Sequence, residues 1–174
     1  RGVHEPPSQD IVGGAEFLIN TTTAETQSKP SLAHLTDGGF VAVWQSTQLQ
    51  GASTGQNDIF AQRFDSTGAK QGPEVQVNSF ATLNQQNADV IGLAGGGFAV
   101  TWQSFGQDGT GHGVFGKVFD ATGAAITADI AVTSSSPGDD TEPSITALAD
   151  GGFVAMWNSL GQDGNQFGVF GQRF

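Results

Sequence analysis

The chain contains no cysteine, which excludes a disulfide framework, a thiolate zinc site and a cysteine nucleophile. Only 6 of its 174 residues are Lys or Arg, and its net charge is −11. A nucleic-acid-binding protein needs a cationic surface, and an anionic membrane surface would repel this chain, so we expect neither partner. No apolar run approaches the roughly 18 residues that a membrane-spanning helix needs, so we expect no membrane span.

Glycine is abundant instead, at 26 residues, and one glycine-led stretch occurs three times. It reads Gly-Gly-Phe, then a short apolar run, then Trp followed by Gln or Asn and Ser, at residues 38–46, 96–104 and 151–159. All 3 Trp residues of the protein lie in these copies. Asp-Gly and Gly-Gly tolerate a positive φ, so we expect a hairpin turn before each copy. Both faces of the Phe-to-Trp run are apolar, which predicts a central strand between packed layers.

Other segments repeat in step with this stretch. Each unit opens with a short alternating strand and continues with a second strand, the Trp strand, a polar loop and a last strand that carries two Phe residues. In each unit, 14 residues separate the acidic opening residue from the start of the second strand, and 14 more lead to Trp. Unit one differs by a three-residue insertion in residues 48–57. Constant strand spacing with variation in one loop is typical of a structural repeat.

The pattern predicts an all-β fold of three four-stranded antiparallel repeats that resemble β-propeller blades. The alternative is a β-prism-like body of three sheets with threefold pseudosymmetry. We expect a flexible leader over residues 1–14 and one repeat domain over 15–174, with units of about 16–73, 74–128 and 129–174. Propellers have 4 to 8 blades, so two chains would form a six-bladed ring, or the chain is a piece of a longer array. The opening strand, Glu16 to Asn20, would complete the sheet that ends at Phe174.

The run from Asp150 to Gly164, continuing from Val169 to Phe174, resembles repeats of large exported bacterial proteins that often accompany haemolysin-type calcium-binding (RTX) segments. The resemblance covers about residues 16–174 and implies an adhesin-like, extracellular or cell-surface setting. The RTX nonapeptide Gly-Gly-x-Gly-x-Asp is absent, so its calcium roll is not implied. We therefore expect a non-catalytic extracellular module for adhesion or assembly, whose partner is another copy of itself or a cell-surface or matrix glycan.

The alternative function is that of a lectin with up to three equivalent sites, because Trp faces stack on sugars and neighbouring amides bind hydroxyl groups. Its candidate ligand-binding residues are Trp44, Gln45, Trp102, Gln103, Trp157 and Asn158. In the competing interpretation, these Trp side chains fill the core.

The polar loops suggest a second ligand. Asp58, Asp108 and Asp163 are candidate Ca²⁺ ligands, since this ion prefers oxygen donors. One Asp per loop fits an Asx-turn equally well. The acidic cluster of Asp139, Asp140 and Glu142 is interpreted as a solvated loop. No set of residues converges on a catalytic pattern, so we expect no enzyme activity.

Overall fold

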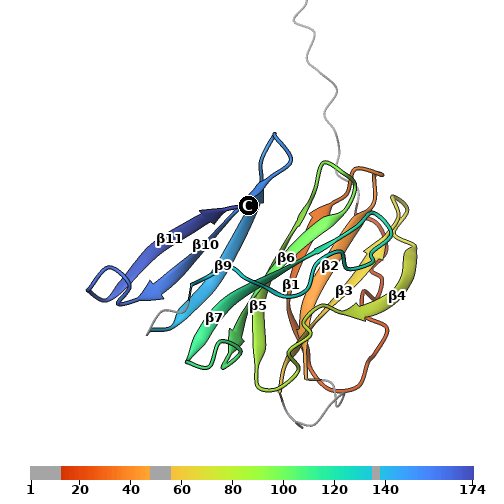
Figure 1. The fold of residues 1–174 in the computed structure, drawn as a ribbon. Helices are drawn as coiled ribbons and strands as arrows, with labels where there is room; N and C mark the ends of the chain where they lie inside the picture. The colour runs from red at the N-terminus through yellow and green to blue at the C-terminus, as the bar shows by residue number, and fades with distance from the viewer. Residues whose placement is uncertain (1–12, 48–55, 135–137) are drawn as a thin grey trace, which may run out of the picture.

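A computed structural model describes residues 13–47, 56–134 and 138–174. Within those residues the chain forms eleven strands and no helix, and the strands make three antiparallel sheets that lie side by side (Figure 1). Sheet 1 contains β1 (Gln27–His34), β2 (Phe40–Ser46), β3 (Asp58–Phe64) and β4 (Lys70–Gln76). Sheet 2 contains β5 (Gln85–Gly92), β6 (Phe98–Phe105), β7 (His112–Phe119) and β8 (Ile130–Ala131). Sheet 3 contains β9 (Asp140–Ala147), β10 (Phe153–Leu160) and β11 (Phe167–Arg173). The predicted all-β fold of three antiparallel, propeller-like sheets is confirmed.

The predicted Gly-Gly hairpins are also confirmed. The first Gly of each turn has a positive φ, 86° at Gly38, 89° at Gly96 and 94° at Gly151. The second Gly is needed for a different reason, because a Cβ at Gly39 would lie 2.2 Å from the Phe64 carbonyl oxygen. Each Gly-Gly pair therefore permits the turn and lets the middle strand start against the neighbouring strand.

Each middle strand begins with a Phe that stacks on the Phe at or next to the end of the neighbouring strand. The ring centroids are 4.7 Å apart for Phe40 and Phe64 and 4.6 Å apart for Phe98 and Phe119. Phe153 and Phe174 repeat the arrangement at 5.0 Å. The repeat that is visible in the sequence is thus reproduced in space.

Each sheet has two apolar faces. We call the face of sheet 1 that carries Trp44, Phe60 and Phe64 its tryptophan face, and the opposite face its valine face. We use both names for the equivalent positions of the other sheets. The valine faces comprise Val41, Val43 and Ile59 in sheet 1, Ala99, Thr101 and Val114 in sheet 2, and Val154, Met156 and Val169 in sheet 3.

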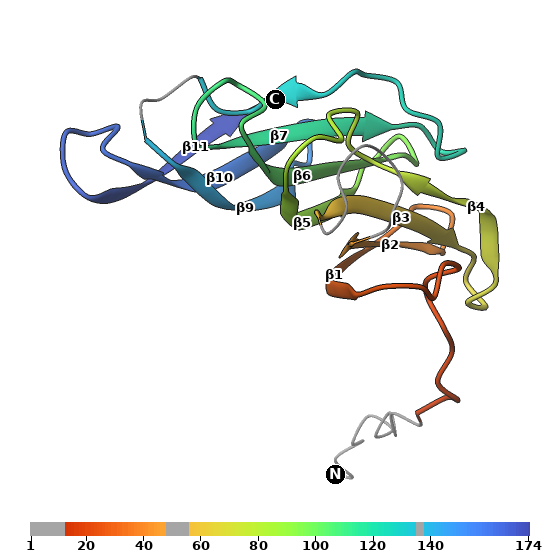
Figure 2. The same cartoon turned by 90° about the horizontal axis from the view of Figure 1, so that it is seen from below.

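The sheets pack valine face on tryptophan face. Val43 and Ile59 of sheet 1 share one buried cluster with Trp102 of sheet 2. Val114 of sheet 2 packs in the same way with Trp157 of sheet 3. Sheet 2 lies between the other two sheets, as Figure 2 also shows. The predicted central strand with two buried faces is confirmed for β2 and β6.

Two details differ from the sequence prediction. Sheet 3 has three strands in the described part of the chain instead of four. Glu16 to Asn20 forms no strand and does not reach sheet 3; it lies against sheet 1, where the Phe17 ring meets Phe64 with centroids 6.0 Å apart. The reason is geometric: the free edge of β11 and this segment lie at opposite ends of the row of sheets (Figure 2).

The sheets also divide the chain differently from the predicted units. β4 spans the predicted boundary at residues 73 and 74, because the opening strand of one unit forms the last strand of the preceding sheet. The division into a leader and one domain stays a prediction, and most of the leader and of the unit-one insertion lies outside the described residues. None of the described segments is a helix long and apolar enough to cross a membrane.

Candidate functional site

The three sheets meet along their first strands, β1, β5 and β9. Each of these strands carries one residue with a positive φ: Lys29 at 52°, Asn87 at 54° and Glu142 at 53°. The strand register shifts at each of these positions, which marks a β-bulge. A bulge re-aims a side chain away from the regular alternation of a strand. The same local irregularity therefore places an ammonium, an amide and a carboxylate at equivalent points of three neighbouring strands.

These residues line one cavity of about 320 Å³, which we call the first-strand pocket. Its lining consists of Lys29, Pro30, Asn87, Ala88, Asp89, Glu142 and Pro143. Lys29 Nζ donates to Asn87 Oδ1 at 2.9 Å, and the Asn158 amide donates to Glu142 Oε2 at 2.9 Å. The pocket wall thus holds both donors and acceptors of hydrogen bonds.

Asp89 of β5 accepts hydrogen bonds from both neighbouring first strands, β1 and β9. Its Oδ1 accepts a hydrogen bond from Ser31 Oγ of β1 at 2.8 Å. Its Oδ2 accepts one from the Ile145 N–H of β9 at 3.1 Å and one from Ser144 Oγ at 3.3 Å. Because both of its carboxylate oxygens accept these bonds, Asp89 positions the strands that form the pocket. Glu142 is the exposed carboxylate of the pocket.

Two of the amide residues that follow Trp, which were predicted to bind a ligand, accept hydrogen bonds from the bulge residues of the next sheet. Gln45 Oε1 accepts the Asn87 N–H of the next sheet at 3.4 Å. Gln103 Oε1 accepts the Glu142 N–H of the next sheet at 3.3 Å and also the Asn87 side-chain amide at 3.1 Å. These two Gln residues therefore contact the residues that line the pocket, and the structure brings them to its margin.

The three Trp side chains lie in the core. Trp44, Trp102 and Trp157 are 3%, 0% and 5% exposed. The indole N–H of Trp102 donates to Gln85 Oε1 at 3.1 Å. Trp102 and Trp157 fill the space between sheets, and Trp44 packs against Phe60 and Phe64 of its own sheet, so all three rings are buried, as the competing interpretation expected. Ligand binding by the six residues of the Trp set stays a prediction.

The structure does not gather the three candidate calcium ligands. Asp58 is buried, and burial raises the pKa of its carboxyl although the Asn78 amide donates to it at 2.7 Å. Asp108 accepts the Thr110 N–H, and Asp163 accepts the Asn165 N–H, both at 3.1 Å, which is Asx-turn geometry. Among the residues that the structure describes, no group of three or more His, Asp or Glu side chains is arranged to hold a metal ion. Calcium binding stays a prediction.

The acidic cluster is not a solvated loop throughout. Asp140 begins β9 and is 1% exposed, and burial raises the pKa of its carboxyl. It occupies the position of Gln85 in the repeat, a position that faces the core in sheet 2 as well. The solvated-loop interpretation is wrong for this residue.

Sequence reasoning did not select Lys29, Asn87 or Asp89 as site residues, and it interpreted Glu142 as part of a solvated loop. One signal was present. Lys, Asn and Glu occupy the same repeat position, directly before the residue that starts the fixed spacing to Trp. A position that varies in charge within a strict repeat indicates a site where the units contribute different groups.

No family model matches the chain, and no curated protein matches it. Two solved structures resemble its fold. One is the Hadza microbial sialidase Hz136, with a TM-score of 0.60 and 13% identity, matched over 83% of this chain and 34% of that one. The other is the endo-arabinase from Bacteroides thetaiotaomicron VPI-5482, with a TM-score of 0.54 and 14% identity, matched over 88% of this chain and 58% of that one. The chain thus spans about a third and somewhat over half of these two proteins.

At such identities the likeness shows the fold alone. It nevertheless contradicts the prediction that the chain is not an enzyme, because both similar structures carry the names of enzymes. That prediction rested on the absence of a convergent catalytic pattern in the sequence, and such an absence does not exclude enzyme activity.

Proposed function

We propose that this chain binds a neutral carbohydrate in the first-strand pocket, as the glycan-contacting part of a carbohydrate-active protein. The observation that carries the proposal is the convergence of three equivalent bulges on one cavity of about 320 Å³, each with a different polar group. Sugar hydroxyls both donate and accept hydrogen bonds, so a wall that mixes an ammonium, an amide and a carboxylate suits them.

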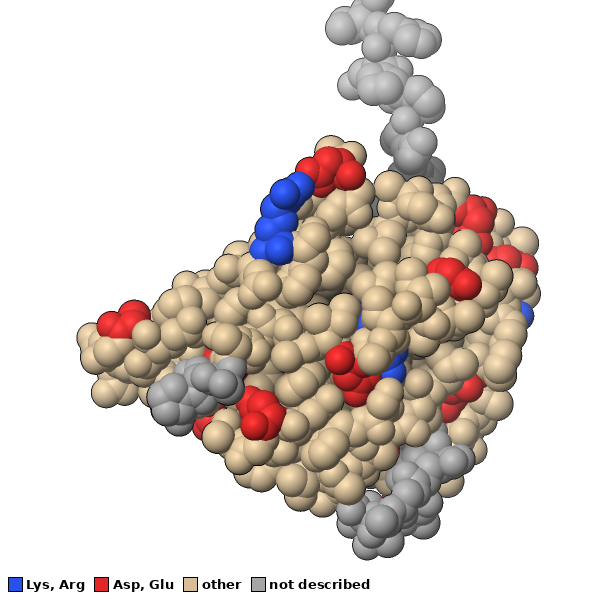
Figure 3. Space-filling view, in the orientation of Figure 1, with Lys and Arg blue, Asp and Glu red and all other residues tan. Residues whose placement is uncertain are grey.

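The fold comparison supports the same class of ligand, since the two similar structures are those of a sialidase and an endo-arabinase. Charge favours a neutral sugar over an acidic one. The pocket combines one cation, Lys29, with the carboxylates of Asp89 and Glu142, and the chain carries a net charge of −11. The face seen in Figure 3 accordingly shows scattered acidic residues and few basic ones.

The experiment is a calorimetric titration with a panel of neutral and acidic oligosaccharides. Removal of one hydrogen-bonding group should cost about 0.5 to 1.5 kcal/mol. Asn87→Ala and Glu142→Gln should therefore each weaken binding about 2- to 12-fold. Asn165→Ala, in the exposed β10–β11 loop, is the matched control and should bind as the parent chain does. No binding to any sugar, or equal loss in the control, would refute the proposal.

The same mixtures are then assayed for newly released reducing ends. Glycoside hydrolases commonly use a pair of carboxyl groups, and Glu142 is the one that the pocket leaves exposed. If sugar is cleaved, Glu142→Gln should abolish release while binding is reduced only moderately. If binding occurs without release, the pocket serves recognition.

The sequence supports three further proposals. The resemblance to exported bacterial repeat proteins supports an extracellular or cell-surface location. It also supports a role in adhesion, in which the pocket would contact a surface or matrix glycan. The Asp-containing loops support calcium binding, which a fall in melting temperature on addition of a chelator would test.

A further inference from the structure

At both junctions between sheets, the valine face of one sheet packs on the tryptophan face of the next. The outer faces of sheet 1 and sheet 3 each resemble one side of such a junction. At each junction a valine face is fully covered by the next sheet. Val43 and Ile59 of sheet 1 are both 0% exposed, as is Val114 of sheet 2. Their equivalents in sheet 3, Met156 and Val169, are 48% and 75% exposed. The valine face of sheet 3 is thus the uncovered half of a junction.

Sheet 1 shows the complementary half. Leu32 of its first strand is 72% exposed, whereas its equivalents in sheets 2 and 3, Val90 and Ile145, are 4% and 7% exposed. A hollow of about 470 Å³ remains on this face. It is lined in part by Phe17, Ile19, Leu32, Phe40, Ala42 and Trp44. The tryptophan face of sheet 1 therefore has room for apolar side chains from a preceding sheet.

The segment Glu16 to Asn20 occupies part of the space over the tryptophan face of sheet 1. Ile19 packs against the cluster of Trp44, as Val77 packs in the cluster of Trp102 at the next junction. The polar contacts match as well. Glu74 accepts the Thr21 N–H at 2.7 Å, and its equivalent Asp129 accepts the Ser79 N–H at 2.9 Å. The segment lies where the last strand of a preceding sheet would lie, although the chain has no such sheet among its described residues.

Among the described residues, sheet 3 has no equivalent of that last strand. In sheet 1 the Val77 N–H donates to the Ile59 carbonyl at 2.8 Å, and Asn78 Oδ1 accepts the Ile59 N–H at 2.8 Å. Sheet 2 repeats the first bond between Val132 and Val114 at 2.9 Å. The position of Ile59 and Val114 in sheet 3 is Val169, on the outer edge of β11. Ile19 and Asn20 carry the residue types that this edge needs, an apolar side chain followed by the same Asn as Asn78.

We propose that a second copy of this chain supplies the missing half of each junction. The valine face of sheet 3 packs on the tryptophan face of sheet 1 of the second copy. Glu16 to Asn20 of that copy then pairs antiparallel with β11 as its fourth strand. The interface continues the two junctions already present within the chain. Because each copy has one of each face, the contact is head-to-tail, and two copies close into a ring of six sheets.

The first test is the mass in solution by light scattering, with 17.9 kDa as the mass of one chain. The parent chain should have twice this mass. Met156→Glu and Val169→Glu should have the mass of one chain, because each buries a charge in the junction. Both sites are exposed in the single chain, so both variants should keep its β-sheet circular dichroism spectrum. Ile126→Glu, at a 62% exposed site in the connection between β7 and β8, is the control and should keep the doubled mass.

A parent chain with the mass of one copy, or with a mass above two copies, would overturn the proposal. So would a doubled mass that persists in Val169→Glu. Since each copy carries a net charge of −11, added salt should favour the ring by screening the repulsion between copies.

The second test addresses the exchanged strand and uses the absence of cysteine in the chain. Ile19→Cys and Val169→Cys are prepared as separate variants and mixed under mild oxidation. Directly paired residues of antiparallel strands lie close enough for a disulfide. A disulfide-linked dimer that contains one chain of each variant is the expected product. Equal amounts of linked dimer in the mixture and in the separate variants would show that the strand is not exchanged in this register.

Discussion

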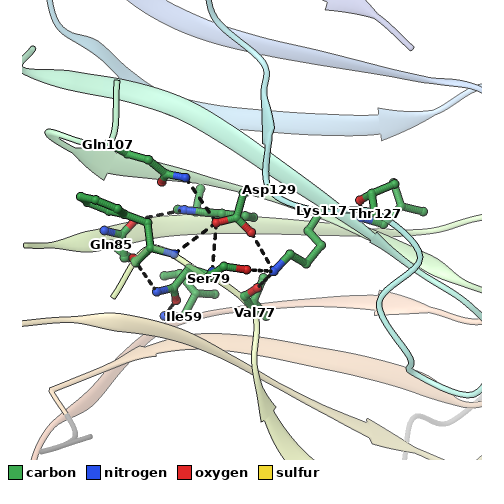
Figure 4. Close-up of polar contacts among 12 residues, drawn as sticks. Ile59, Val77, Ser79, Gln85, Gln107, Lys117, Thr127 and Asp129 are labelled. Carbon is green, nitrogen blue, oxygen red and sulfur yellow. Dashed lines mark hydrogen bonds and ion pairs between the residues drawn. The ribbon is translucent and has the colours of Figure 1, made fainter. Parts of the chain in front are cut away.

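A buried ion pair of sheet 2, which also contacts the segment that follows β4 of sheet 1, allows a quantitative test of how the two sheets are joined. Lys117 Nζ lies 2.7 Å from Asp129 Oδ1, and the two side chains are only 7% and 8% exposed. The ammonium also donates to the Val77 carbonyl at 2.5 Å and to Ser79 Oγ at 2.8 Å. Asp129 Oδ2 accepts the Ser79 N–H, so both partners contact the short segment that follows β4 (Figure 4).

We expect Asp129→Asn to destabilise the chain strongly, because it leaves the Lys117 ammonium buried without a counter-charge. Removing one partner of a buried pair costs about 3 to 5 kcal/mol. For a chain of this length, 1 kcal/mol corresponds to about 2 to 4 °C in melting temperature, so the loss is about 6 to 20 °C. Lys117→Gln introduces the residue that units one and three carry at this position, Gln62 and Gln172.

The double variant, Lys117→Gln with Asp129→Asn, removes both charges and should recover at least half of the loss. The measurement is urea denaturation of the four proteins, which gives the free energy of unfolding and the coupling between the two sites. If the two single losses simply add in the double variant, the pair does not join the sheets as the geometry indicates.

The same variants should differ in their response to acid. Burial by itself raises the pKa of Asp129, but the hydrogen bond and charge of Lys117 and the Ser79 N–H outweigh it, and the pKa lies below its ordinary value. An unfolded Asp titrates at about 3.9. The stability that the ionised Asp129 provides is therefore complete above that pH and is lost as the pH falls through the lower folded pKa. The parent chain should lose more stability than Asp129→Asn does over this acid range.

Three further substitutions test the packing and a buried charge. A Cβ at Gly92 would lie 2.1 Å from the His34 carbonyl oxygen, whereas one at Gly95 would meet nothing within 4 Å. Gly92→Ala should therefore lose at least about 2 kcal/mol, and Gly95→Ala should stay within about 1 kcal/mol of the parent in the same denaturation assay. Burial raises the pKa of Asp140, so its ionised form weakens the fold once the pH rises through that pKa. Asp140→Asn should raise the melting temperature at neutral pH by about 2 to 4 °C, and a lower melting temperature would contradict this account.

The features that the sequence predicted correctly are those that short stretches of chain determine. The turn at Gly38 and Gly39 follows from backbone sterics, and the two-sided apolar pattern from Phe40 to Trp44 follows from strand alternation. Each appears three times, so one prediction was supported by three copies. The position of Asp140 was missed although the same reasoning applied, because alignment with Gln85 would have placed it on a first strand facing the core.

The candidate site could not be predicted in the same way, because its geometry comes from contacts between sheets. A positive φ is uncommon for Lys and Glu, and no local pattern indicates it at Lys29 or Glu142. At Glu142 the bulge is held by Gln103 of the preceding sheet, through a hydrogen bond of 3.3 Å. The location of Glu16 to Asn20 depends on tertiary structure as well, since the strand pattern does not say which sheet edge is within reach.

The hydrogen bonds behind the pocket connect the proposed ligand site with the proposed ring. Gln45 and Gln103 each hold the bulge of the following sheet, whereas Asn158, their equivalent in sheet 3, donates to Glu142 of its own sheet. In the two-copy ring the sheet that follows Asn158 is sheet 1 of the second copy, whose bulge residue is Lys29. Ring closure would then place a second Lys29 ammonium, from the second copy, after the row of bulge residues Lys29, Asn87 and Glu142. Saccharide affinity should consequently fall in Val169→Glu, although Val169 does not line the pocket. A variant with the mass of one chain and unchanged affinity would separate the two proposals and leave sugar binding to the single chain.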